Sequence, residues 1–129
     1  MTMRSRVRRS AAALVVLWSL GLWPAAAHHG GDVEWAEAPV GPITGTATKF
    51  AFQFPHVFFE MNVGTDGGTE PWSITTRWTP TILRDHGWSR ESIKPGDEIT
   101  VTYLPHVDKP RVGQMVTVEV NGRALPLSF

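Results

Sequence analysis

The chain has 129 residues and no cysteine, which fits a single domain and excludes a disulfide framework, a thiolate nucleophile and a cysteine-based metal site. Twelve basic residues balance twelve acidic ones, but residues 1–27 hold four arginines and no acid. The remainder has eight basic against twelve acidic residues, a net charge of −4, which argues against nucleic acid as a partner because phosphate binding needs a concentrated positive patch.

Residues 1–27 have the three parts of a secretory signal peptide. The four arginines form a positive start, and an apolar stretch over 11–22 follows, well short of the ~20 residues that span a bilayer. Ala25 and Ala27 then supply the small residues of a cleavage site. The segment predicts Sec-type export to a bacterial periplasm or the medium. Cleavage is expected after Ala27 or Ala26, leaving no stable membrane anchor.

The mature chain divides into an extended lead-in over 28–41, rich in glycine, alanine, proline and acid, and one domain over 42–129. From residue 43 onward, period-two alternation of apolar and polar residues predicts strands. The first expected strand covers 43–49, and Gly45 would let it bend, as the corner of a barrel requires.

Two further strands and a helix are expected next. The second strand opens at His56, and its inward side chains are Val57, Phe59, Met61 and Val63. The third strand has a matching inward face, which consists of Trp72, Ile74, Thr76 and Trp78. The residues 65–68 between the two strands predict a hairpin turn. A two-turn helix over 80–86 is bounded by Thr79 as its cap and Gly87 as its stop, with Leu83 facing inward.

The last part of the chain again alternates. Residues 94–97 predict a turn, and two strands follow whose inward side chains are Ile99, Val101 and Tyr103, then Val116, Val118 and Val120. Asn121-Gly122 is a strong hairpin signal, after which 124–127 is expected to return as a short strand.

The order of three strands, a short helix and further strands is typical of an OB-type fold. We therefore predict an all-β domain with one short helix, arranged as a small, partly open OB-like barrel of five to six strands. The alternative is a plain β-sandwich, and the position of the helix between the third and fourth strands favours the barrel.

The chain also resembles the small exported bacterial proteins of domain-of-unknown-function family 6152. The residues that carry the resemblance are Ala27-His28-His29, Gly45-Thr46-Ala47-Thr48, Pro55-His56-Val57, Trp72, residues 83–88 and residues 93–97. The chain departs from the family pattern at Phe54, where asparagine is usual, and at Gly30, where serine is usual. The resemblance implies export and a small β fold, and it brings no activity with it.

His28 and His29 at the cleavage junction are candidate copper ligands. Cleavage after Ala27 would free the amine of His28, and an amine with its own imidazole is a chelate that suits Cu(II). Cleavage after Ala26 would place His29 third from the amine, where the amine, two backbone nitrogens and an imidazole suit square-planar Cu(II) or Ni(II). The alternative is that the pair is only a polar start beside the peptidase site.

His56 is a third candidate metal ligand, and the strand it opens offers a ligand surface. Alternation places His56, Phe58 and Glu60 on the outer face of the second strand, and Met115 is expected on the outer side of the fifth. In OB folds the face of the second and third strands binds ligands. The alternative for His56 is a hydrogen bond to backbone that fixes a bulge at Pro55.

Two weaker patterns also involve binding chemistry. Met61, Met115, His56 and His106 would suit Cu(I) if they met, although methionine more often fills a core. The four tryptophans of the mature chain would suit an aromatic platform, although packing is their commoner use.

Side-chain pairs for catalysis are missing from the sequence pattern. Asp85 and His86 are neighbours on a helix and point apart, and Ser89 and Ser92 lie in no nucleophile-elbow context. We therefore expect no enzyme but an exported binding or accessory protein, with copper as the candidate cofactor and an envelope protein as the candidate partner. The alternative is a structural domain that docks to another envelope protein without a metal.

Overall fold

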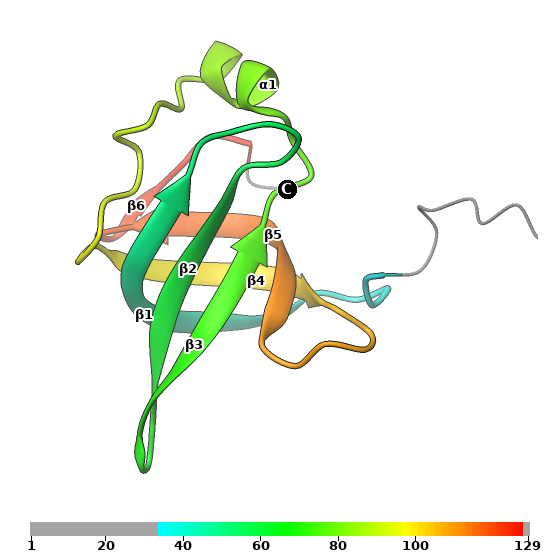
Figure 1. Ribbon diagram of the computed structural model, residues 1–129, viewed down its shortest axis with the longest axis vertical. Coiled ribbons are helices and arrows are strands. Elements are labelled where there is room, and N and C mark those ends of the chain that lie inside the picture. Colours follow the sequence, from blue (N-terminus) through cyan, green and yellow to red (C-terminus); the bar gives the residue numbers. More distant parts are fainter. Residues whose placement is uncertain (1–33, 128–129) are drawn as a thin grey trace, which may run out of the picture.

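A computed structural model describes residues 34–127, which form six strands and one helix (Figure 1). In chain order the elements are β1 (Val40–Ala51), β2 (Phe58–Thr65), β3 (Gly68–Thr75), α1 (Pro80–Asp85), β4 (Glu98–Pro105), β5 (Val112–Val120) and β6 (Arg123–Ala124). In this part of the chain, no helix has the length and apolar character needed to cross a membrane.

The six strands make one sheet that closes on itself. Their order is β3-β2-β1-β4-β5-β6, and β3 also pairs with β5. The β3–β5 pairing is parallel and spans Ser73 to Thr75, whereas the other pairings are antiparallel. Backbone hydrogen bonds therefore run in a ring through five strands, with the helix between β3 and β4. The predicted all-β, OB-like arrangement is confirmed.

Strand β1 belongs to both halves of the ring because it bends. Its first half, Val40 to Thr46, pairs with β4, and its second half, Gly45 to Ala51, pairs with β2. Gly45 lies at the overlap and faces both Val63 and Ile99. A β-carbon there would overlap the backbone carbonyl of Asn62 and press on the Met61 side chain. The predicted role of Gly45 as the corner agrees with this geometry.

The core fills the inside of the ring. The most deeply buried large side chains come from β2, β3, β4 and β5 and from the helix region, and they are Phe59, Met61, Ile74, Leu83, Trp88, Ile93, Ile99, Val101 and Val118. Each such side chain contributes roughly 1.5–3 kcal/mol when it leaves water. The ring of Trp72 packs edge-on against Tyr103, with 5.3 Å between centroids, and burial raises the pKa of Tyr103.

Helix α1 covers one end of the ring, near the β1–β2 connection (Figure 1). Thr79 caps the helix by accepting a hydrogen bond from the backbone N–H of Ile82, and Leu83 is fully buried beneath it. Gly87 ends the helix with a φ of +90°, a conformation that favours glycine. The indole N–H of Trp88 then donates to the carbonyl of Pro126 at 2.8 Å and holds the C-terminal segment.

Two predictions about strand faces and boundaries need correction. Met115, expected on the outer surface, is only 4% exposed and belongs to the core. The reason is a β-bulge: Thr102 pairs with Thr117 but Tyr103 pairs with Met115, so one extra β5 residue interrupts the alternation. The first strand is also longer than the predicted range of 43–49, because β1 begins at Val40 and ends at Ala51.

Replacing Gly45 by alanine should destabilise the protein by about 1–3 kcal/mol, because the added methyl group overlaps the neighbouring backbone. Gly64 is the matched control, since a β-carbon there would meet nothing within 4 Å. Urea unfolding followed by tryptophan fluorescence measures both. Equal midpoints for Gly45→Ala and Gly64→Ala would contradict the corner role of Gly45.

Candidate functional site

The outer side of β1, β2 and β3 carries the candidate site. Lys49 pairs with Glu60 across β1 and β2, and Glu60 pairs in turn with Ser73 on β3. Phe58 pairs with Thr75 one step further along the same side. Because side chains alternate along a strand, these five share the outer surface, which we call the Lys49 face.

Lys49 is held between an aromatic ring and a carboxylate. Its ammonium nitrogen lies 3.5 Å from the Glu60 Oε1 atom and 5.2 Å from the centroid of the Phe58 ring. The side chains of Lys49 and Glu60 are 56% and 43% exposed. An ion pair this exposed is worth only about 0–1 kcal/mol, so both charges stay open to exchange with a partner's charges.

A hollow of about 240 Å³ adjoins this face, where the β4–β5 connection comes near the strands. Glu60, Trp72, Ser73 and Arg111 are among the residues that line it, and we call it the Trp72 hollow. The N–H of Ser73 donates to the carbonyl of Arg111 at 3.0 Å, which fixes the connection against β3. The indole N–H of Trp72 is buried and meets no hydrogen-bond acceptor within residues 34–127. A buried donor without a partner lowers the stability of the fold by about 1–3 kcal/mol.

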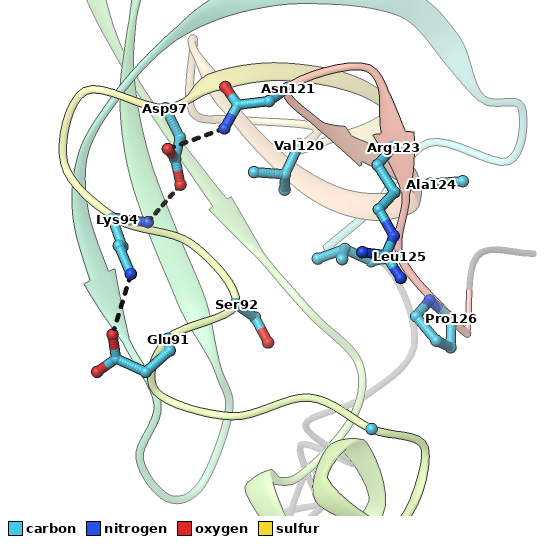
Figure 2. A pocket seen from close by; sticks show the side chains of 11 residues that line it. Glu91, Ser92, Lys94, Asp97, Val120, Asn121, Arg123, Ala124, Leu125 and Pro126 are labelled. Atoms are coloured by element: carbon cyan, nitrogen blue, oxygen red, sulfur yellow. Dashed lines mark hydrogen bonds and ion pairs between the residues drawn. The ribbon is translucent and has the colours of Figure 1, made fainter.

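A larger groove of about 640 Å³ lies elsewhere, between the segment before β4 and the β5–β6 turn (Figure 2). Its polar groups bind one another. Asp97 accepts hydrogen bonds from the side-chain amide of Asn121 at 3.0 Å and from the backbone N–H of Lys94 at 2.8 Å. Lys94 pairs with Glu91 at 3.4 Å, and the hydroxyl of Ser92 accepts from the N–H of Ser89.

These contacts make the groove a structural clamp between two turns. The hydrogen bond from Asn121, followed by that from Lys94, holds the pKa of Asp97 below its ordinary value of 3.8. Asn121 also accepts from the N–H of Glu98 through its side-chain oxygen, at 2.9 Å. Because the hydrogen-bonding groups of Asp97 and Asn121 are already engaged, we place the candidate binding site on the Lys49 face and not in this groove.

The predicted metal ligands do not come together in the described part of the chain. His56 is exposed in the β1–β2 connection, and Met61 and Met115 are buried in the core. Residues 34–127 contain no group of three or more histidine, aspartate or glutamate side chains that could hold a metal. His28 and His29 lie outside the described residues, so the copper site remains a prediction.

His106 has a structural role. Its Nδ1 atom accepts hydrogen bonds from the N–H groups of Asp108 and Lys109, at 3.0 and 3.1 Å. In this neutral tautomer the proton sits on Nε2, which leaves that atom without a lone pair for a metal. The ring also packs edge-on against Trp35, with 5.3 Å between centroids, and fixes the end of the lead-in.

Sequence reasoning missed Lys49. Simple alternation places it on the same side as Ala47, which is buried. In the structure Ala47 pairs with Met61 but Lys49 pairs with Glu60, so Thr48 is an extra residue that turns Lys49 outward. The sequence signal at this point is the pair of adjacent polar residues Thr48 and Lys49, and such a pair does not locate a bulge. Phe58 and Glu60 do lie together on the predicted outer side, without Met115.

The fold and this face define a small, mostly β protein with an exposed polar and aromatic strand surface. The chain belongs to the family described as Family of unknown function (DUF6152), whose model matches residues 16–116. The resemblance seen in the sequence is thereby confirmed. No curated protein matches the chain.

Asp97 should make stability depend on pH in the acid range. Its pKa is lowered on folding, so its contribution is present above the unfolded value of 3.8 and is lost as pH falls through the lower folded value. At about pH 6 the Asp97→Asn variant should be less stable by about 1 kcal/mol, because a charge-assisted hydrogen bond is weakened. Urea midpoints should converge for the two proteins as the pH falls below the lowered folded pKa of Asp97. A gap that stays constant over this range would contradict the clamp, and Glu70→Gln, a change at an exposed strand position, is the control.

Copper binding tests the N-terminal histidines. The intact mass of the exported protein identifies the mature N-terminus, and we expect residues 1–27 to be absent. That protein should bind Cu(II) through its free amine and His28 or His29, with affinity falling below about pH 6 as protons compete for the same nitrogens. A version extended by Met-Gly keeps both histidines but buries the amine in a peptide bond, so its titration should show much weaker binding. Identical titrations would eliminate the terminal site.

Proposed function

We propose that the chain is an exported accessory protein without catalytic activity, which binds another envelope protein on its Lys49 face. The observation that carries the proposal is the side-by-side arrangement of Lys49, Phe58 and Glu60 beside the Trp72 hollow. Export is the expectation from the N-terminal segment.

The position of the face supports binding. In OB-type folds the surface of the second and third strands, flanked by the β1–β2 and β4–β5 loops, is the usual ligand surface. Phe58, Glu60 and Ser73 lie on these two strands, and Arg111 comes from the β4–β5 connection. An aromatic ring, both signs of charge and hydroxyl groups suit a protein surface better than a polyanion.

The surroundings of the polar side chains support an accessory role over catalysis. The Nδ1 atom of His86 donates to the carbonyl of Ile82 at 2.9 Å, within its own helix. The Nδ1 atom of His106 accepts a hydrogen bond from a backbone N–H of its own turn, and the hydroxyl of Ser92 also accepts from a backbone N–H. Each of these three side chains therefore bonds to backbone of its own segment, and none of these contacts joins a hydroxyl to a histidine as a nucleophile and its base would be joined. Copper at His28 and His29 is a separate proposal, which binding on the Lys49 face does not require.

A matched pair of charge reversals tests the proposal. The mature protein is immobilised and exposed to envelope extract, captured proteins are quantified by mass spectrometry, and the affinity of the purified partner is then measured. Lys49→Glu should weaken that affinity about tenfold, because it reverses a charge on the face. Arg123→Glu makes the same basic-to-acidic change at an exposed position of β6 and should leave the affinity unchanged. Equal affinity for the two variants would refute binding on the Lys49 face.

A further inference from the structure

A second hollow is lined in part by Lys49 itself. It has a volume of about 330 Å³, and its lining residues are Lys49, Phe50, Ala51, Phe52, Gln53 and Arg90. The end of β1 forms one side, and Arg90, from the segment after α1, forms the other. We call it the Arg90 hollow. It is lined by two cations and no carboxylate, in a domain whose overall charge is negative.

The positive charge of Arg90 is not neutralised nearby. Its sequence neighbour Glu91 pairs with Lys94 instead, at 3.4 Å. No carboxylate of residues 34–127 lies within ion-pair distance of the Arg90 guanidinium. Lys49 has one exposed partner, Glu60, at 3.5 Å, and an incoming carboxylate can share or replace it.

The rest of the hollow is aromatic and well supported. Phe50 packs on the ring of Phe52, with 6.0 Å between centroids, and on the buried Trp88, with 6.4 Å. The guanidinium of Arg84 lies 5.7 Å from the centroid of Phe52 and holds that ring from the side of α1. Phe54, two residues further along the connection, is 66% exposed. This arrangement offers an apolar side chain a surface directly beside the two cations.

We infer that the Arg90 hollow binds a short acidic segment of a partner protein. A carboxylate of that segment contacts Arg90 and Lys49, and a neighbouring apolar side chain packs on Phe52. The inference rests on the proposed function, and it names the chemistry of the partner from charge complementarity. An anionic membrane surface fits less well, because the cations line a hollow with an aromatic wall, whereas membrane-surface binding relies on basic and apolar side chains that project into the lipid interface.

Selection from a random peptide library displayed on phage, with the mature protein as bait, tests the inference. Enriched peptides should share aspartate or glutamate next to an aromatic or aliphatic residue. Fluorescence polarisation with one enriched, labelled peptide then measures affinity. Arg90→Glu should weaken binding about tenfold, since it replaces an attraction by a repulsion. Arg123→Glu makes the same reversal at an exposed position in the other groove and should leave binding unchanged.

The other outcomes separate the inference from the proposed function. If an enriched peptide binds the Arg111→Glu variant more weakly but binds the Arg90→Glu variant as tightly as the native protein, the inference is overturned. The Lys49 face with its Trp72 hollow is then the binding site. Enrichment of peptides without acidic residues would also overturn the inference. Binding of the protein to phosphatidylglycerol vesicles, lost in Arg90→Glu and with no peptide enriched, would replace the acidic segment by a membrane surface.

Discussion

The sharing of one bent strand between both halves of the sheet is the constraint on which this structure depends. β1 pairs with β4 along its first half and with β2 along its second, and Gly45 lies where the two pairings overlap. The backbone of Asn62 comes so close that no side chain fits at that corner. Once β1 turns there, Lys49 lies beside Glu60 and Phe50 packs against the core, so the Arg90 hollow, which both residues line, depends on the bend.

Two single-residue bulges then decide which chemistry is exposed. The extra residue at Thr48 turns Lys49 from the core side to the outer face, and the extra residue at Val116 turns Met115 from the outer face into the core. Beyond each bulge, the residues that simple alternation places inward face outward and the reverse, because side chains alternate with a period of two. The surface therefore gains a cation and loses a thioether, a side chain that prefers soft metals.

Much of the fold was predictable because its signals are local. The inward residues of β2, β3 and β4, the Thr79 cap, the Gly87 stop and the Asn121-Gly122 turn all follow from patterns within a few residues, and all agree with the structure. The site was only half predictable. The outward positions of Phe58 and Glu60 follow from alternation, but that of Lys49 depends on a bulge. Arg90 and Arg111 line the two hollows only because segments distant in the sequence come together. The hydrogen bonds that commit His106 to its turn are likewise invisible in a residue pattern.

Native-state hydrogen exchange tests the central role of β1 most directly, because it measures how much free energy each part of the sheet needs to open. If one bent strand holds both halves together, amide protons of β2 and of β4 that pair with β1 should exchange through the same opening, at a free energy close to that of global unfolding. Exchange of the β4 amides at a much lower free energy, while the β2 amides stay protected, would show that the two halves open independently and would contradict the account.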